Sequence, residues 1–171
     1  MSLAISSEIL KKKLFCSSLK ENNSSSKNCK MESTLSSPIT IETTVNAPLE
    51  KVWECWTQPQ HICKWYFASE DWHAPRAEND LQIGGKFFIR MEAKDQSFGF
   101  DFEGIYTNVE PHMSIEYVLA DNRKVLSQFI AHGNQTRVIE TFDAEGENSL
   151  EMQKTGWQAI LDNFKKHCEA V

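Results

Sequence analysis

The sequence predicts an α+β fold in which a curved antiparallel sheet of six or seven strands surrounds one long C-terminal helix. Three observations predict it. Residues 39–45 alternate apolar and polar side chains, as a half-buried strand does. Residues 86–142 contain further segments with this period of two, separated by turn residues. The last segment changes to helical spacing, with an apolar stripe formed by Leu150, Trp157, Leu161, Phe164 and Cys168.

Length and charge narrow the class of protein. The chain has 171 residues, 40% of them hydrophobic, which suits one domain with an ordinary core. Residues 1–30 hold six lysines and two glutamates, a charge of +4, so residues 31–171 carry −10 to give the total of −6. An acidic body disfavours nucleic acid as a partner, because phosphate binding needs clustered Lys and Arg. No apolar run is long enough for a membrane span.

The N-terminal segment, residues 1–37, differs in composition from the body at 38–171. It is basic and rich in Ser and Asn, with little to bury, and we expect it to be disordered. Lys11–Lys13 precede only two apolar residues, too few for the apolar region of a signal peptide. A true translation start near Met31 would also explain the unusual composition of residues 1–30.

The cysteines indicate free thiols. Their number is odd, and they form neither a C-x-x-C pair nor a Cys/His cluster at the sequence spacing of a zinc site. We therefore expect a reduced, cytoplasmic protein with no metal and no cofactor. The five positions are Cys16, Cys29, Cys55, Cys63 and Cys168.

The helices have recognisable starts. Asn46-Ala47-Pro48 offers a cap and an initial proline for a helix that runs to about Trp56. Pro59 begins a second, short helix. For the long C-terminal helix, Asn148 with Glu151 three residues later resembles a capping box.

The strands follow from alternation and turn residues. Residues 71–78 contain Pro75, which favours an edge strand. Gly104, inside the run that begins at Phe98, indicates a bulge or bend. The remaining strands are expected at 86–93, 98–103, 113–119, 125–131 and 135–142.

This order of elements resembles the START-like, SRPBCC or Bet v 1-like superfamily, and within it the domain homologous to the activator of heat-shock protein 90 ATPase. The resemblance covers everything except the N-terminal segment, residues 1–37, with Trp56 standing where an aliphatic residue is usual. Its fragments are Val45-Asn46-Ala47-Pro48, Val52-Trp53-Glu54-Cys55-Trp56-Thr57, Lys64-Trp65-Tyr66, Ile83-Gly84-Gly85-Lys86-Phe87, Phe102-Glu103-Gly104 and Gly156-Trp157. It implies the helix-grip fold, with a cavity between the sheet and the long helix.

We expect aromatic and aliphatic side chains to line that cavity. Phe87, Ile89, Met91, Phe98, Phe100 and Phe102 face inward on the predicted strands. The segment from Trp65 to Trp72 would form the mouth. For each residue taken alone, ordinary core packing is the commoner explanation, and the cavity is expected from the fold. A satellite cluster beneath a loop is the alternative for the mouth. The predicted lining is Trp65, Phe67, Trp72, Phe87, Ile89, Phe98, Phe100, Phe102, Tyr117, Phe129, Trp157 and Leu161.

The sequence identifies no catalytic residue. Neither a nucleotide-binding glycine loop nor a G-x-S-x-G motif is present. Asp101 and Glu103 fall on the outward face, and residues 70–73 form the one compact ionisable cluster near the mouth. Surface positions are expected for the scattered histidines, which are His61, His73, His112, His132 and His167.

Three functions remain open from the sequence. The first is non-catalytic binding of a small apolar or amphipathic ligand in the cavity, which the fold and its aromatic lining favour. The second is a chaperone partner, namely regulation of a heat-shock protein 90-type ATPase, which the resemblance suggests. The third is a cyclase or hydrolase of a hydrophobic substrate, which would require a polar pair buried inside the cavity.

Overall fold

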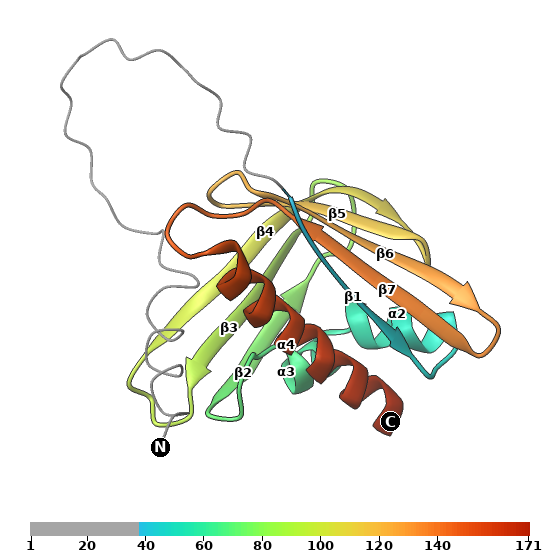
Figure 1. The fold of residues 1–171 in the computed structure, drawn as a ribbon, viewed down its shortest axis with the longest axis horizontal. Coiled ribbons are helices and arrows are strands. Elements are labelled where there is room, and N and C mark those ends of the chain that lie inside the picture. The colour runs from blue at the N-terminus through green and yellow to red at the C-terminus, as the bar shows by residue number, and fades with distance from the viewer. Residues whose placement is uncertain (1–37) are drawn as a thin grey trace, which may run out of the picture.

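The computed structural model describes residues 38–171, and these form an antiparallel sheet curled around one long helix (Figure 1). This arrangement confirms the predicted helix-grip fold, with seven strands in the sheet. The predictions of disorder, of no signal peptide and of a start near Met31 concern residues 1–37 and lie outside the described residues. Within residues 38–171, none of the helices combines the length and hydropathy needed to cross a membrane.

Neighbouring strands in the sheet are also consecutive in the chain, except that β1 pairs with β7. The strand order is β1-β7-β6-β5-β4-β3-β2, and each neighbouring pair is antiparallel. Helices α2 and α3 carry the chain from one edge strand, β1, to the other, β2. The elements are β1 (Ile39–Val45), α2 (Leu49–Thr57), α3 (Pro59–Trp65), β2 (Trp72–Asn79), β3 (Lys86–Ala93), β4 (Gly99–Glu110), β5 (Ser114–Leu119), β6 (Lys124–His132), β7 (Gln135–Phe142) and α4 (Leu150–Ala170).

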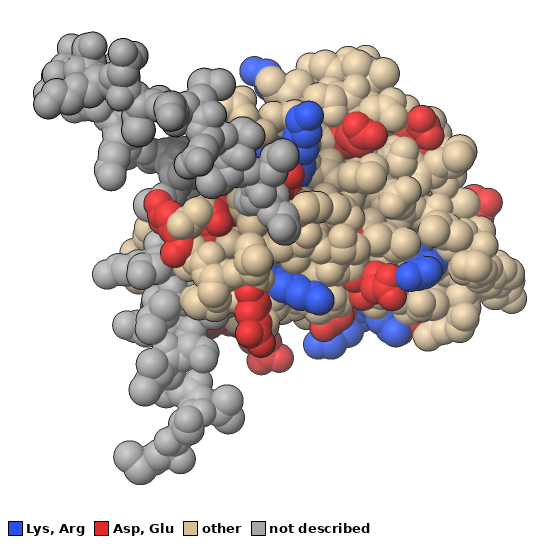
Figure 2. All heavy atoms as spheres, turned by 45° about the horizontal axis from the view of Figure 1, so that its top comes forward, with Lys and Arg blue, Asp and Glu red and all other residues tan. Residues whose placement is uncertain are grey.

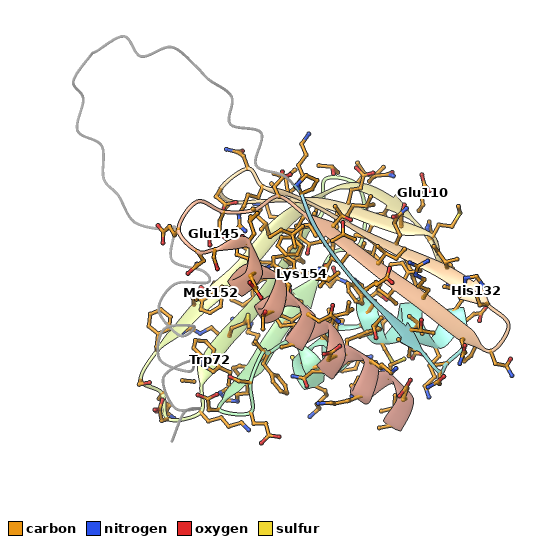
Figure 3. All side chains as sticks on the ribbon, in the orientation of Figure 1. Trp72, Glu110, His132, Glu145, Met152 and Lys154 are labelled. Carbon is orange, nitrogen blue, oxygen red and sulfur yellow. The ribbon has the colours of Figure 1, made fainter. Side chains whose placement is uncertain are left out.

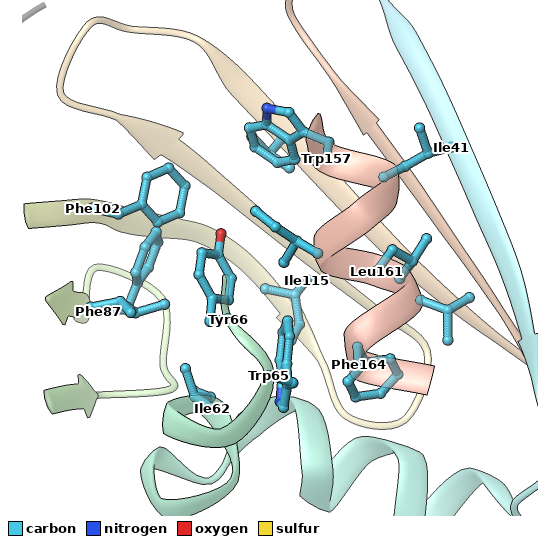
Figure 4. Close-up of a cluster of buried hydrophobic side chains, with 14 of the residues drawn as sticks. Ile41, Ile62, Trp65, Tyr66, Phe87, Phe102, Ile115, Trp157, Leu161 and Phe164 are labelled. Carbon is cyan, nitrogen blue, oxygen red and sulfur yellow. The ribbon is translucent and has the colours of Figure 1, made fainter. Parts of the chain in front are cut away.

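Helix α4 packs its apolar stripe against the concave face of the sheet. Trp157 stacks on Phe142 with ring centroids 4.0 Å apart and an interplanar angle of 14°. One helical turn further on, Leu161 is buried, and Phe164 meets the ring of Trp65 edge to face. Figure 4 shows side chains from α3, the sheet and α4 meeting in this cluster. The core therefore lies between α4, α3 and the concave face.

The start of α4 differs from the prediction. Its N-cap is Ser149, whose hydroxyl accepts a hydrogen bond from the Met152 N–H at 3.2 Å. The Asn148 side chain instead donates to Glu145 in the preceding loop. Leu150 is 51% exposed and so lies off the buried stripe. The buried face of the helix consists of Gln153, Gly156, Trp157, Ile160, Leu161, Phe164 and Cys168.

Both ends of α4 are tied to other segments by hydrogen bonds. The buried Gln153 side chain donates to the carbonyl oxygens of Glu145 and Asn148 and accepts from the Glu145 N–H. Near the other end, the backbone and side-chain nitrogens of Asn46 both donate to the Glu169 carboxylate at 2.8 Å. Asn46 is therefore not the cap of α2, which begins after Pro48 without a side-chain cap.

Irregularities in the sheet lie partly where the sequence indicates. Strand β2 is an edge strand, as Pro75 predicts, and its register shifts between His73 and Arg76. On β4 the register shifts between Tyr106 and Asn108, whereas Gly104 pairs regularly on both sides. The prediction of a bulge at Gly104 is therefore wrong.

Charged side chains of both signs cover the exterior. Figure 2 shows Lys and Arg interspersed with Asp and Glu on the face in view. Several of them form ion pairs across strands, such as Arg90 with Asp101 at 2.9 Å. Exposed pairs of this kind contribute little to stability, about 0–1 kcal/mol each. The fold therefore depends on its apolar interior.

Gly104 is required because an aromatic ring lies where a side chain would be. A Cβ atom at this position would meet Phe87 Cε1 at 2.7 Å and the Val118 carbonyl oxygen at 2.9 Å. Contacts this short force a neighbour to move. The glycine therefore permits close packing between β3, β4 and β5.

We expect Gly104→Ala to lower the free energy of unfolding by about 1–3 kcal/mol, the usual cost of overpacking. Urea denaturation measures the change. Gly146→Ala is the matched control, because an added Cβ there has nothing within 4 Å, and its effect should stay within about 0.5 kcal/mol. Equal stability of the two variants would contradict this account of Gly104.

Candidate functional site

A cavity of about 40 Å³ lies between α3, the end of α2 and the concave face of the sheet. Its lining includes five of the predicted residues, which are Trp65, Phe87, Ile89, Phe102 and Tyr117. The remaining lining residues are Trp56, Thr57, Ile62, Tyr66, Asn79, Tyr106, Ile115 and Glu140. The wall is therefore aromatic over much of its area, with a minority of polar groups.

Other predicted lining residues fill the core instead. Trp157 and Leu161 pack α4 against the sheet, and Phe129 meets the rings of Trp53 and Trp56 edge to face. Trp157 and Leu161 lie outside the cavity lining because α4 packs closely on the sheet there, and Phe129 lies outside it because α2 covers this part of β6.

The residues predicted to form the mouth of the cavity differ in their surroundings. Phe67 is half-buried against the core. Trp72, at the start of β2 (Figure 3), belongs to the core cluster and packs with Phe98 and Phe100 at its edge. Phe98 precedes β4 and contacts Trp72 and Phe100, which lie on the inward face of the sheet, but it is 38% exposed and lies outside the cavity lining. The mouth residues Trp65, Tyr66 and Trp72 thus belong to the core cluster, and no separate satellite cluster is seen among the described residues.

The volume of the cavity limits its contents. One ordered water needs about 10–15 Å³, so 40 Å³ holds only a few small groups. Drug-sized ligands occupy pockets of about 300–1,000 Å³. A large apolar ligand could enter only if lining side chains moved aside.

A carboxyl group lies in the interior of the sheet. Glu140 on β7 is opposite Ile41 on β1 and Ser127 on β6, and Ser127 is opposite Ile115 on β5. All four side chains are buried, and Glu140 is 6% exposed. One inward-facing row thus carries a carboxyl and a hydroxyl between two isoleucines.

Few hydrogen bonds reach this carboxyl. The hydroxyls of Ser127 and Tyr117 donate to Glu140 Oε1 at 3.2 and 3.5 Å. Burial raises the pKa of Glu140 to about 7, because desolvation of the charged form outweighs these two bonds. Near neutral pH the group is therefore divided between its acid and its carboxylate.

Tyrosine hydroxyls extend the polar end of the cavity. The side chain of Tyr66, which follows α3, hydrogen-bonds with that of Tyr117 on β5. Desolvation raises the pKa of both phenols well above the usual value, so they stay neutral donors. Tyr106 on β4 donates to Asn79 Oδ1 at 2.7 Å, and Asn79 in turn donates to the Thr57 carbonyl. These contacts hold the ring positions around Glu140.

Sequence analysis missed Glu140, although a signal was present. The strand 135–142 is predicted from the sequence, and its apolar residues Val138 and Phe142 are an even number of positions apart, so they share one face of the strand. Glu140 lies between them with the same phase, so it must share their inward face. A carboxyl group at an inward position of a central strand is the observation that marks this site.

Most of the other predicted polar residues lie at the surface. Asp101 and Glu103 are exposed, as expected, and so are Glu70 and Asp71. His73 is half-buried beside Glu92, and two further histidines form a pair. His61 Nδ1 and His167 Nε2 lie 2.9 Å apart in a half-buried position, whereas the sequence predicted two separate surface residues.

The family comparison covers most of the chain. Residues 46–169 match the family model described as "Activator of Hsp90 ATPase homolog 1-like protein". No curated protein matches the chain.

Several solved structures are similar to this chain. The AHSA1-like protein from Aeromonas hydrophila, solved by NMR, is 44% identical, with a TM-score of 0.75 over 78% of this chain and 93% of its own. A protein from Cytophaga hutchinsonii is 49% identical, with a TM-score of 0.68 over 77% of this chain and 92% of its own. A Chromobacterium violaceum protein shares the fold at 19% identity, with a TM-score of 0.69 over 78% and 98% of the two chains.

The family match and the two more similar structures agree with the fold and with the order of elements. The chain therefore belongs to the family of activator of Hsp90 ATPase homolog 1-like proteins, within the START-like superfamily.

Proposed function

We propose that this protein binds a small molecule with an apolar body and one hydrogen-bond donor group, and that the donor meets Glu140. The observation that carries the proposal is a buried carboxyl at the polar end of an aromatic cavity. Burying a carboxyl costs folding free energy, and such strongly perturbed groups concentrate at functional sites. A bound donor group offsets that cost.

The geometry defines which part of the carboxyl serves a ligand. The bonds from Ser127 and Tyr117 both end on Oε1, which leaves Oε2 with capacity for a further donor. The aromatic wall, which includes Trp65 and Phe102, suits a flat apolar body. Since the cavity measures only about 40 Å³, the proposed ligand is small, or it displaces lining side chains as it enters.

Titration with four probes of this chemistry tests the proposal. Phenol, benzyl alcohol, benzamide and benzylamine are added to the ¹⁵N-labelled chain, and the amide shifts of Tyr117, Ser127 and Glu140 are followed by NMR. We expect at least one probe to bind more tightly than about 1 mM, equivalent to about 4 kcal/mol. Failure of all four to shift these amides below that concentration would overturn the proposal.

The Glu140→Gln variant links binding to the carboxyl. We expect it to weaken the best probe by about tenfold or more, because a hydrogen bond to a charged group is worth about 1.5–3 kcal/mol. Glu116→Gln is the matched control, because Glu116 is exposed on β5, beside the inward-facing Tyr117. Equal affinity in the two variants would show that the probes bind elsewhere.

Acid–base catalysis is a second candidate function. It is favoured by the pKa of about 7 for Glu140, since a general acid or base works best when its pKa is near the ambient pH. A cyclase or hydrolase, the third function left open by the sequence, would use Glu140 with Tyr117 beside it. The same NMR samples report turnover, because new ligand signals would then appear over time with the native chain and not with Glu140→Gln. Regulation of a heat-shock protein 90-type ATPase stays a prediction, because it rests on the family description alone.

Burial of Glu140 also predicts a pH-dependent stability. The folded-state pKa of about 7 exceeds the ordinary value of 4.5, so the folded protein binds the proton more tightly than the unfolded chain. Its contribution to stability is therefore fully present below pH 4.5 and is lost as the pH rises to about 7. The 2.5-unit difference corresponds to about 3 kcal/mol.

Urea denaturation of the native chain and of Glu140→Gln across this pH range measures the effect. We expect the free energy of unfolding of Glu140→Gln to rise relative to that of the native chain by up to about 3 kcal/mol between pH 4.5 and pH 7. Above pH 7 the difference between the two should stay constant. Glu116→Gln should show no such trend. A constant difference between Glu140→Gln and the native chain at all pH values would refute a buried, neutralised Glu140.

A further inference from the structure

Three side chains of metal-ligating type meet where α2, α3 and α4 contact one another. Cys55 on α2, His61 on α3 and His167 on α4 place their ligand atoms within 4.8 Å of one another. Cys55 is 1% exposed, and both histidines are half-buried. We propose that these three side chains form a binding site for Zn²⁺, and this proposal is independent of the function proposed for Glu140.

The zinc site is separate from the cavity, because none of its three residues belongs to the cavity lining. Failure of the site would therefore leave the function proposed for Glu140 unaffected.

The spacing of the two imidazoles suits a shared ion. His61 Nδ1 and His167 Nε2 are 2.9 Å apart, with ring centroids separated by 5.2 Å. Two nitrogen ligands of a tetrahedral Zn²⁺, each about 2.0–2.1 Å from the metal, lie about 3.3 Å from each other. A small separation of the rings, by a few tenths of an ångström, would therefore admit the ion.

The donor set selects the metal by its chemistry. One thiolate and two imidazoles are ligands for a borderline-soft ion such as Zn²⁺, whereas Mg²⁺ and Ca²⁺ prefer oxygen. The Cys168 thiol hydrogen-bonds with that of Cys55, so a further sulfur lies beside the site. With three protein ligands, the fourth coordination position is open to water.

Binding requires a defined movement of protons. At present a hydrogen must lie between His61 Nδ1 and His167 Nε2, because two bare lone pairs would repel each other. In the metal complex both nitrogens present lone pairs, so each ring carries its proton on the other nitrogen. The proton of the Cys55 thiol leaves to solvent.

Nearby positive charge opposes the ion. Lys51 and Lys64 act electrostatically on His167. A single thiolate lowers the charge of the bound Zn²⁺ unit to +1, which reduces this repulsion. The alternative to a metal site is a simple hydrogen bond between the two histidines, and the following experiment distinguishes them.

Cobalt substitution tests the site directly. The tag-free chain carries Cys16→Ser and Cys29→Ser, so that cysteines outside the described residues do not compete, and it is kept reduced. We expect one equivalent of Co²⁺ to produce thiolate-to-cobalt charge-transfer absorption and the strong visible bands of tetrahedral coordination. Added Zn²⁺ should abolish both, and Mg²⁺ should have no effect.

Variants assign the ligands. Cys55→Ser should remove the charge-transfer band, and His61→Gln combined with His167→Gln should weaken Co²⁺ binding at least 100-fold. The matched controls are Cys63→Ser, on α3 but outside the cluster, and His132→Gln, at the turn between β6 and β7 (Figure 3). Both controls should bind as the parent does.

If Cys55→Ser fails to fold, the double histidine variant still tests the site, because both of its histidines are only half-buried. Circular dichroism reports whether each variant is folded. The proposal is overturned if the parent chain binds no Co²⁺ with thiolate absorption, or if the double histidine variant, folded, binds it as tightly as the parent.

Discussion

Burial of one face of α4 in the concave sheet is the interaction on which the rest of the structure depends. The stacked rings of Trp157 and Phe142 fix the middle of the contact, and an aromatic pair of this kind adds about 0.5–1.5 kcal/mol beyond its buried area. Gln153 and Glu169 secure the two ends of the helix. This placement also brings His167 to α3, where it meets His61.

The close contact of α4 also explains how the interior is divided. Where the helix meets the sheet, large side chains such as Leu161 fill the space completely. Beside α3 the helix no longer fills the curve of the sheet, and the tyrosines around Glu140 border the remaining cavity. The fold thus combines a packed part, in which α4 fills the curve of the sheet, with a smaller part that holds a mainly aromatic cavity and a minority of polar groups.

The sequence predicted the fold well because its signals are local. Alternation over seven residues in β1, and helical spacing from Trp157 to Cys168, report which faces are buried. Capping was harder to predict, because Asn148 and Ser149 are both good N-caps and only the loop contacts of Asn148 decide between them.

The candidate sites depend on contacts between distant segments, which spacing along the chain does not reveal. His61 and His167 meet because α3 and α4 cross, although 106 positions separate them. Glu140 was detectable from the phase of its own strand, but the scarcity of its hydrogen bonds follows only from the positions of Tyr117 and Ser127.

The place of Glu140 in the sheet has an evolutionary consequence. Strand β7 pairs with β1 on one side and β6 on the other, so the backbone at Glu140 is held in register by both neighbours. Exchange of this one side chain would alter the chemistry of the interior while leaving the backbone in place. Members of a family built on this scaffold could therefore diversify in what they recognise by substitution at a single inward position.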